Sequence, residues 1–187
     1  MGVRAAAAGM ESVTGMAARW IAALGLAALP ALAHEGPTPN RVDVSAKLST
    51  SGQPTKAFLE TLKEQGYEAV VYLAPPTVGD AIADEPKIVG RQGLLYVNVP
   101  IVWERPTAAD FDAFTRVMKA LENRKVWVHC QMNLRASSMV FLHRVITLKE
   151  PPDKAWESVT RAWVPNSTWK AYILATLKAN GVAYEPF

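Results

Sequence analysis

The segment 125–138 constrains the fold of this chain most, because it joins a buried strand to a helix through a loop of reactive and charged residues. Residues 126–128 form a short apolar run typical of a strand, and the apolar residues at 139–148 predict a helix. Between these two elements lie Cys130, the only cysteine of the chain, and Arg135. The sequence therefore predicts a strand–loop–helix unit that carries a thiol and a guanidinium group in the same loop.

A loop of this kind can bind an anion and activate a thiol. Its backbone N–H groups can converge on one anion, and the N-terminus of the following helix adds the positive end of a dipole. The same field favours a thiolate over a thiol. Arg135 adds a planar, permanently charged group that can bind two oxygens of a phosphate. The plainer alternative is that Cys130 is a small buried apolar side chain, as free cysteines often are.

Length and composition are typical of one globular domain, and the sequence shows no motif for a metal or a cofactor. The chain has 187 residues, half of them hydrophobic, and a net charge of +3. The charge is not clustered, so neither nucleic acid nor an anionic membrane is expected as a partner. One cysteine excludes an intrachain disulfide framework. The three histidines and the cysteine show no metal-ligand spacing, and no glycine-rich nucleotide loop is present, so we expect no metal and no cofactor.

Residues 1–33 are typical of a secretory signal peptide. Arg4 and Arg19 precede a short apolar run that ends in a small-x-small cleavage sequence at 31–33. The run is too short for a comfortable membrane span, although a retained N-terminal anchor is an alternative. Cleavage would leave a single-domain mature chain, 34–187, in the periplasm or outside the cell and without a membrane contact.

Strand and helix patterns alternate along the mature chain, which indicates an α/β fold. The near-continuous apolar run at 68–74 is typical of a strand buried on both faces of a parallel sheet. We therefore predict a parallel-rich central sheet flanked by helices, with a helical C-terminal part. The segment 49–55 is interpreted as a turn. Strands are expected at 41–44, 68–74, 94–100 and 124–129, and helices at 55–66, 86–91, 107–121, 135–148, 154–163 and 168–180.

The loop resembles the signature of cysteine-dependent phosphatases of the protein-tyrosine and dual-specificity type. Residues 128–130 and 135–137 carry this resemblance, which extends over most of the mature chain. Residues 51–54, followed by a helix and a strand at Val70, are similar to the opening of small bacterial members. Residues 99–100, followed by an acidic loop residue, are similar to the segment that supplies their general acid. The resemblance implies a phosphatase-like α/β sandwich that hydrolyses a phosphorylated small molecule or a phosphoprotein.

The resemblance also assigns a role to each residue of the site. Cys130 would attack phosphorus and form a cysteinyl-phosphate intermediate, while Arg135 would bind the equatorial oxygens. Glu104 would protonate the leaving oxygen. Ser137, or the serine after it, would donate a hydrogen bond to the thiolate, and His129 would orient the loop. The residues expected to contact the substrate are His129, Gln131, Met132, Asn133, Leu134, Ala136, Ser137 and Trp103.

Three features of the site differ from the family pattern. Four residues rather than five separate Cys130 from Arg135, the loop has no glycine, and the acid position holds Glu104 rather than an aspartate. Asn133 tolerates the left-handed backbone region and is expected to replace the glycine. Asp110 is a second candidate acid, although a position in the first turn of a helix, favoured by the helix dipole, explains an aspartate there better.

The shorter loop leaves two other functions open. Rhodanese-like sulfurtransferases resemble it in loop length, and their smaller cradle suits a cysteine persulfide. A catalytically silent oxyanion-binding module is the other alternative. The helical C-terminal part fits the phosphatases better, so phosphatase activity is the leading prediction.

Overall fold

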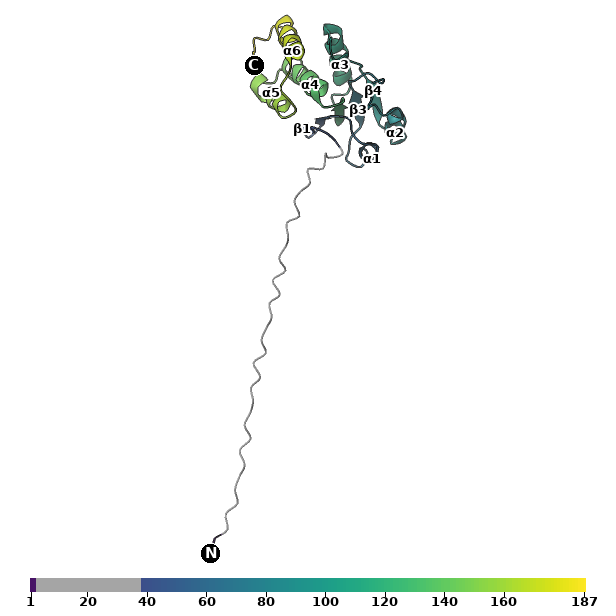
Figure 1. The fold of residues 1–187 in the computed structure, drawn as a ribbon, viewed down its shortest axis with the longest axis vertical. Helices are drawn as coiled ribbons and strands as arrows, with labels where there is room; N and C mark the ends of the chain where they lie inside the picture. The colour runs from purple at the N-terminus through teal and green to yellow at the C-terminus, as the bar shows by residue number, and fades with distance from the viewer. Residues whose placement is uncertain (3–37) are drawn as a thin grey trace. The chain divides into compact units, whose positions relative to one another are not determined.

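The structure, a computed structural model, describes residues 1–2 and 38–187 (Figure 1). Apart from its first two residues, the predicted signal peptide at 1–33 lies outside the described residues, so its presence and cleavage stay predictions. Within the described part of the chain, no helix combines the length and the apolar character that a membrane crossing requires.

In the described part of the chain, a sheet of five strands in the order β1-β2-β5-β3-β4 forms the centre of the fold. β2, β5, β3 and β4 are parallel to one another, and β1 is an antiparallel edge strand. The predicted α/β fold with a parallel-rich sheet is therefore confirmed. The strands are β1 (Val42–Ser45), β2 (Leu48–Ser51), β3 (Ala69–Tyr72), β4 (Leu95–Asn98) and β5 (Val126–His129).

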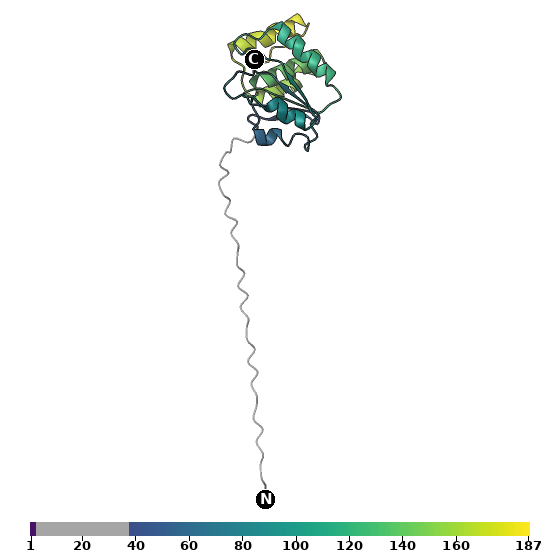
Figure 2. The same ribbon diagram turned by 90° about the vertical axis from the view of Figure 1, so that its right-hand side faces the viewer.

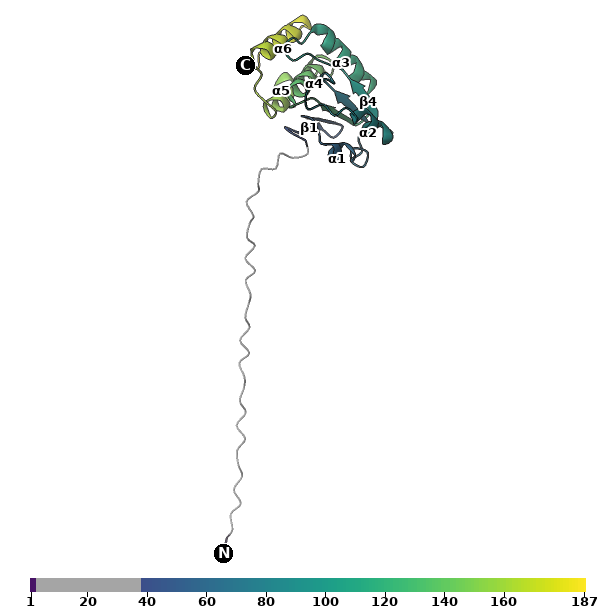
Figure 3. The same ribbon diagram turned by 45° about the vertical axis from the view of Figure 1, so that its right-hand side comes forward.

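Within residues 38–187, six helices cover the two faces of the sheet (Figures 2 and 3). Because neighbouring residues of a strand point to opposite faces, each strand contributes to two apolar clusters. Trp127 packs into a smaller cluster with α1 and α2, whereas Val126 and Val128 belong to the larger core with the other four helices. The helices are α1 (Lys56–Leu59), α2 (Glu85–Arg91), α3 (Ala108–Ala120), α4 (Leu134–Ile146), α5 (Pro152–Thr160) and α6 (Ser167–Ala179).

Helix α4 is the central helix of the larger core. All of its 13 residues except Leu134 are buried, and it contacts α3, α5 and α6. Both its apolar residues and its polar ones, Arg144 among them, are buried, so other elements surround the helix. Because α4 begins directly after the cysteine loop, this packing fixes the position of the loop.

The segment 49–55 was predicted as a turn, but its first three residues belong to the strand β2, so the prediction is wrong there. Ser49 and the next two residues are buried, and the Ser49 hydroxyl lies 2.7 Å from an Asp43 carboxylate oxygen and 2.6 Å from the Tyr67 hydroxyl. Polar side chains that satisfy one another can be buried without an apolar alternation. The helix predicted at 55–66 is also shorter than expected, because only the four residues of α1 are helical and turns follow.

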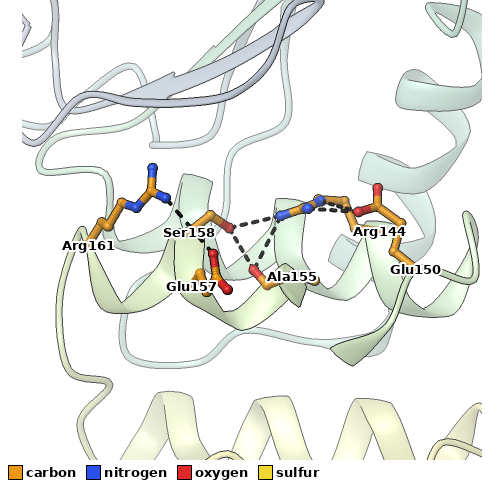
Figure 4. A network of polar contacts seen from close by, with 6 residues as sticks. All are labelled: Arg144, Glu150, Ala155, Glu157, Ser158 and Arg161. Carbon is orange, nitrogen blue, oxygen red and sulfur yellow. Dashed lines mark hydrogen bonds and ion pairs between the residues drawn. The ribbon is translucent and has the colours of Figure 1, made fainter. Parts of the chain in front are cut away.

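A buried arginine connects α4 to α5 (Figure 4). The Arg144 guanidinium donates to the Glu150 carboxylate at 2.7 and 3.1 Å, to the Ala155 carbonyl at 3.3 Å and to the Ser158 hydroxyl at 3.2 Å. Only 5% of Arg144 is exposed. This arginine therefore depends on Glu150 for its counter-charge.

We expect the substitution Glu150→Ala to lower the free energy of unfolding by about 1–3 kcal/mol, since it leaves a buried charge without its partner. Glu157→Ala is the matched control, because Glu157 pairs with Arg161 at 4.0 Å on the surface (Figure 4). An exposed pair of this kind contributes only about 0.2–1 kcal/mol. Urea unfolding measures the free energy of unfolding of both variants. Equal losses would show that the buried pair stabilises the fold no more than the surface pair does.

Candidate functional site

Cys130 lies at the carboxyl end of β5, the strand between β2 and β3 in the sheet. Its backbone N–H donates to the Ser51 carbonyl at 3.2 Å, and only 1% of the residue is exposed. A cavity of about 170 Å³ opens beside it. The residues that line this cavity are Trp103, Cys130, Gln131, Met132, Leu134 and Arg135, all of them predicted site residues.

The N-terminus of α4 has no protein cap. Asn133 occupies the cap position with φ +68°, and its side chain makes no capping hydrogen bond. The first backbone bond of the helix runs from the Ser137 N–H to the Asn133 carbonyl, so the N–H groups of the first turn have no acceptor within the helix. Such an end binds anions. The predicted left-handed conformation of Asn133 is confirmed.

The guanidinium group of Arg135 is fixed at the side of the cavity. Its Nε donates to the Ile101 carbonyl at 3.0 Å, and Nη1 donates to the Gln131 side-chain oxygen at 3.3 Å. The group also lies over the Trp103 ring, 5.3 Å from its centroid. Trp103, predicted to reach the site, therefore supports the arginine as well as lining the cavity. This geometry holds a permanent positive charge next to Cys130.

The segment before β1 holds the outer side of the loop. Asn40 donates from Nδ2 to the Met132 carbonyl at 3.0 Å, and Asn133 donates from Nδ2 to the Asn40 carbonyl at 2.5 Å. Gly52 packs so closely that a Cβ there would lie 2.7 Å from the Gln131 carbonyl oxygen. The sequence analysis missed Asn40, because a contact across 92 residues leaves no local pattern.

His129 is fully buried and has an acidic partner that the sequence analysis missed. Its Nε2 lies 2.6 Å from an oxygen of Glu85, a residue of α2 that is 1% exposed. The His129 ring also stacks on the Tyr72 ring, with centroids 4.7 Å apart. The predicted role of His129 in orienting the loop fits this arrangement, although the side chain does not line the cavity.

The predicted hydrogen bond from a serine to Cys130 is not present within the described residues. The Ser137 hydroxyl donates to the Asn133 carbonyl at 2.7 Å, and the Ser138 hydroxyl donates to the Leu134 carbonyl at 2.9 Å. Serines inside a helix commonly bond to the carbonyl four residues earlier. Ser137 therefore bonds to the backbone at the start of α4 rather than to the thiol.

The candidate acids occupy different positions. Glu104 lies exposed in the turn after Trp103 and makes no hydrogen bond or ion pair within the described part of the chain. Asp110 forms a capping box with Thr107 at the start of α3, which confirms its plainer interpretation. Asp80, which the sequence analysis missed, accepts a hydrogen bond from the Gln131 side chain at 2.9 Å. Among residues 38–187, no three His, Cys, Asp or Glu side chains are grouped as metal ligands.

We expect Asn40→Ala to lower the free energy of unfolding by about 2 kcal/mol. About 1 kcal/mol comes from the lost hydrogen bond and a similar amount from placing alanine at φ +49°. Asn123→Ala is the control, because Asn123 is an exposed turn residue. Urea unfolding compares the two, and a loss no larger than that of the control would show that the segment before β1 does not hold the loop.

A protein-family model described as "DSP-PTPase phosphatase fused to NAD+ Kinase" matches residues 9–171 of the chain. The chain is also 32% identical over 114 residues to the "Beta-lactamase hydrolase-like protein" of two strains of Xylella fastidiosa. That match covers 56% of this chain and 25% of the relative, so the chain spans about a quarter of the length of these curated relatives.

Solved structures share the fold. A DUF442 protein from Shewanella putrefaciens, described as a phosphatase, has a TM-score of 0.71 and 27% identity, and the match covers 79% of this chain and 97% of that chain. The core catalytic domain of the PP-IP phosphatase SIW14 from S. cerevisiae has a TM-score of 0.60 at 13% identity, covering 74% of this chain and 85% of that chain. At that identity the second match shows the common fold alone.

Proposed function

The chain belongs to the family of DSP-PTPase phosphatases, and on that premise we propose that it hydrolyses phosphomonoesters at Cys130. One observation carries the proposal: Cys130, the guanidinium of Arg135 and the uncapped N-terminus of α4 meet at a single cavity. This arrangement combines a nucleophile with the positive field that a phosphate group requires.

In the first step, the Cys130 thiolate attacks phosphorus and the P–S bond forms as the bond to the leaving oxygen breaks. The negative charge on the equatorial oxygens is stabilised by Arg135 and by the N–H groups at the start of α4. In the second step, water attacks phosphorus, the P–S bond breaks, and inorganic phosphate and the thiolate are released. A carboxyl group donates a proton to the leaving oxygen and later accepts one from the water.

Glu104 and Asp80 compete for the role of this general acid. The family resemblance favours Glu104, whereas the contacts favour Asp80. Asp80 is bound to Gln131, and the other end of the Gln131 amide accepts a hydrogen bond from Arg135. Asp80 is thus linked to the loop, whereas Glu104 has no such contact. We therefore assign the acid role to Asp80.

The mouth of the cavity supports a substrate with one phosphate on an apolar or aromatic body. Met132, which lines the cavity, is 47% exposed, and the Trp103 ring lies against Arg135 and stacks on Trp169 of α6. Arg135 is the only cationic side chain among the residues that line the cavity. A densely charged polyphosphate would need more cations than this. Both a small aryl phosphate and a phosphoprotein side chain fit this description.

Loop length supports sulfur transfer as a second candidate. The loop has four residues between Cys130 and Arg135, whereas the phosphatases it resembles have five. The shorter loop forms a narrower anion-binding site. A persulfide on Cys130 needs less space than a phosphate.

We also propose, from the sequence of residues 1–33, that the mature chain acts in the periplasm or outside the cell, which N-terminal sequencing of the exported protein would test.

We expect the wild-type chain to release phosphate from para-nitrophenyl phosphate and Cys130→Ser to abolish this activity. Arg135→Ala should lower kcat by about 10²–10³-fold, since it removes a charge that stabilises the transition state. Asn123→Ala serves as the control. Thiocyanate formation from thiosulfate and cyanide, without phosphate release, would instead establish the sulfur-transfer function. Sulfate binding without either turnover would indicate a silent binding module.

We expect Asp80→Asn to lower kcat for phenyl phosphate by about 10²-fold or more, because a poor leaving group needs a proton donor. The effect should be smaller with para-nitrophenyl phosphate, whose leaving group is more acidic. Glu104→Gln is the matched variant and should change kcat little with either substrate. If Glu104→Gln shows the dependence on the leaving group and Asp80→Asn does not, the acid role belongs to Glu104.

A further inference from the structure

One buried carboxylate is connected to both sides of the nucleophile. Glu85 lies at the start of α2 and is 1% exposed. Its Oε1 lies 2.6 Å from Nε2 of His129, the residue before Cys130. Its Oε2 accepts a hydrogen bond from the Gln53 side chain at 3.0 Å. Both oxygens of the carboxylate therefore have partners close to the cysteine loop.

Gln53 continues the connection to the residue after the nucleophile. Its backbone N–H donates to the Gln131 carbonyl at 2.9 Å. Three contacts thus connect His129 to Glu85, Glu85 to Gln53 and Gln53 to Gln131. His129 and Gln131 are the residues before and after Cys130. The cysteine is held on both sides by groups that converge on one carboxylate.

Among the described residues, the contact with Glu85 is the only hydrogen bond of the His129 ring. The ring is fully buried and stacks on Tyr72, and its Nδ1 has no hydrogen-bond partner among the described residues. An Nε2–H that donates to Glu85 is consistent with this environment, because an unpaired acceptor remains at Nδ1. Burying a carboxylate in this way is a poor means of gaining stability, since an apolar side chain in its place is often as stabilising.

We propose that Glu85 is a positioning residue for Cys130. It fixes the ring orientation and the Nε2–H tautomer of His129, and through Gln53 it fixes the Gln131 carbonyl. The sulfur is thereby held beside the N-terminus of α4. The effect on turnover rests on the proposed phosphatase function, whereas the effect on the reactivity of the thiol does not.

The test compares Glu85→Ala with Glu85→Gln in the full chain. Glu85→Ala should lower kcat for para-nitrophenyl phosphate by about 10²-fold, the size of effect expected from a small displacement of a reacting group, with little change in KM. It should also slow the reaction of Cys130 with iodoacetamide. The Glu85→Gln variant should recover most of both rates, because its amide oxygen can accept from His129. If the Gln53 amide turns over, its oxygen, which has no partner within the described residues, can accept a hydrogen bond from the new NH₂ group.

Asp84→Ala is the matched control, because Asp84 is the neighbouring carboxylate and pairs with Lys56 at the surface. Nitrogen-15 NMR of the His129 ring should show the Nε2–H tautomer in the wild type and in Glu85→Gln, and a tautomer mixture in Glu85→Ala. If Glu85→Ala does not fold, Gln53→Ala is the second variant, because it removes only the hydrogen bond between Gln53 and Glu85. It should still slow both the hydrolysis of para-nitrophenyl phosphate and the alkylation of Cys130.

A folded Glu85→Ala variant with wild-type kcat, alkylation rate and tautomer would overturn the proposal. So would a Gln53→Ala variant with unchanged rates, if Glu85→Ala cannot be prepared. If the wild type releases no phosphate but Glu85→Ala still slows alkylation, the positioning role stands and the phosphatase function fails.

Discussion

The candidate site depends on one electrostatic arrangement, the uncapped positive end of α4 beside the cavity at Cys130. The helix itself is buried in the larger core, and this packing places its N-terminus beside the cavity. Asn133 makes the arrangement possible, because its left-handed conformation turns the chain from the loop into the helix without a side-chain cap. The N–H groups of the first turn are left for an anion, and Arg135 adds a full charge to their partial charges.

A loop with four residues between cysteine and arginine and no glycine needs support from elsewhere in the chain. The segment before β1 contributes Asn40, β2 leads to Gly52, and α2 contributes Glu85. All three groups lie far from the loop in the sequence, and each contacts a different part of it. The parallel pairing of β2 and β3 with β5 brings them to one edge of the sheet. The sheet topology therefore determines the geometry of the loop as much as the residues within the loop do.

The strand–loop–helix unit could be predicted from the sequence, because its apolar runs and its Cys130 and Arg135 are local signals. The alternation of strands and helices predicted the α/β sheet for the same reason. β2 could not be predicted, since its buried serines and threonine show no apolar alternation. Asp80, Glu85 and Asn40 were missed because their contacts with the loop depend on the tertiary fold. Ser137 was assigned from family resemblance, and the helix geometry gives its hydroxyl a backbone partner instead.

The central claim is that Cys130 becomes covalently phosphorylated during turnover. The most direct measurement is the intact mass of the protein, with peptide mapping, after rapid acid quenching during hydrolysis of an aryl phosphate. The account predicts a mass increase of one phosphoryl group on the peptide that contains Cys130, and no increase in Cys130→Ser. An unmodified cysteine peptide during steady phosphate release, or a sulfur adduct formed with thiosulfate in its place, would contradict the account.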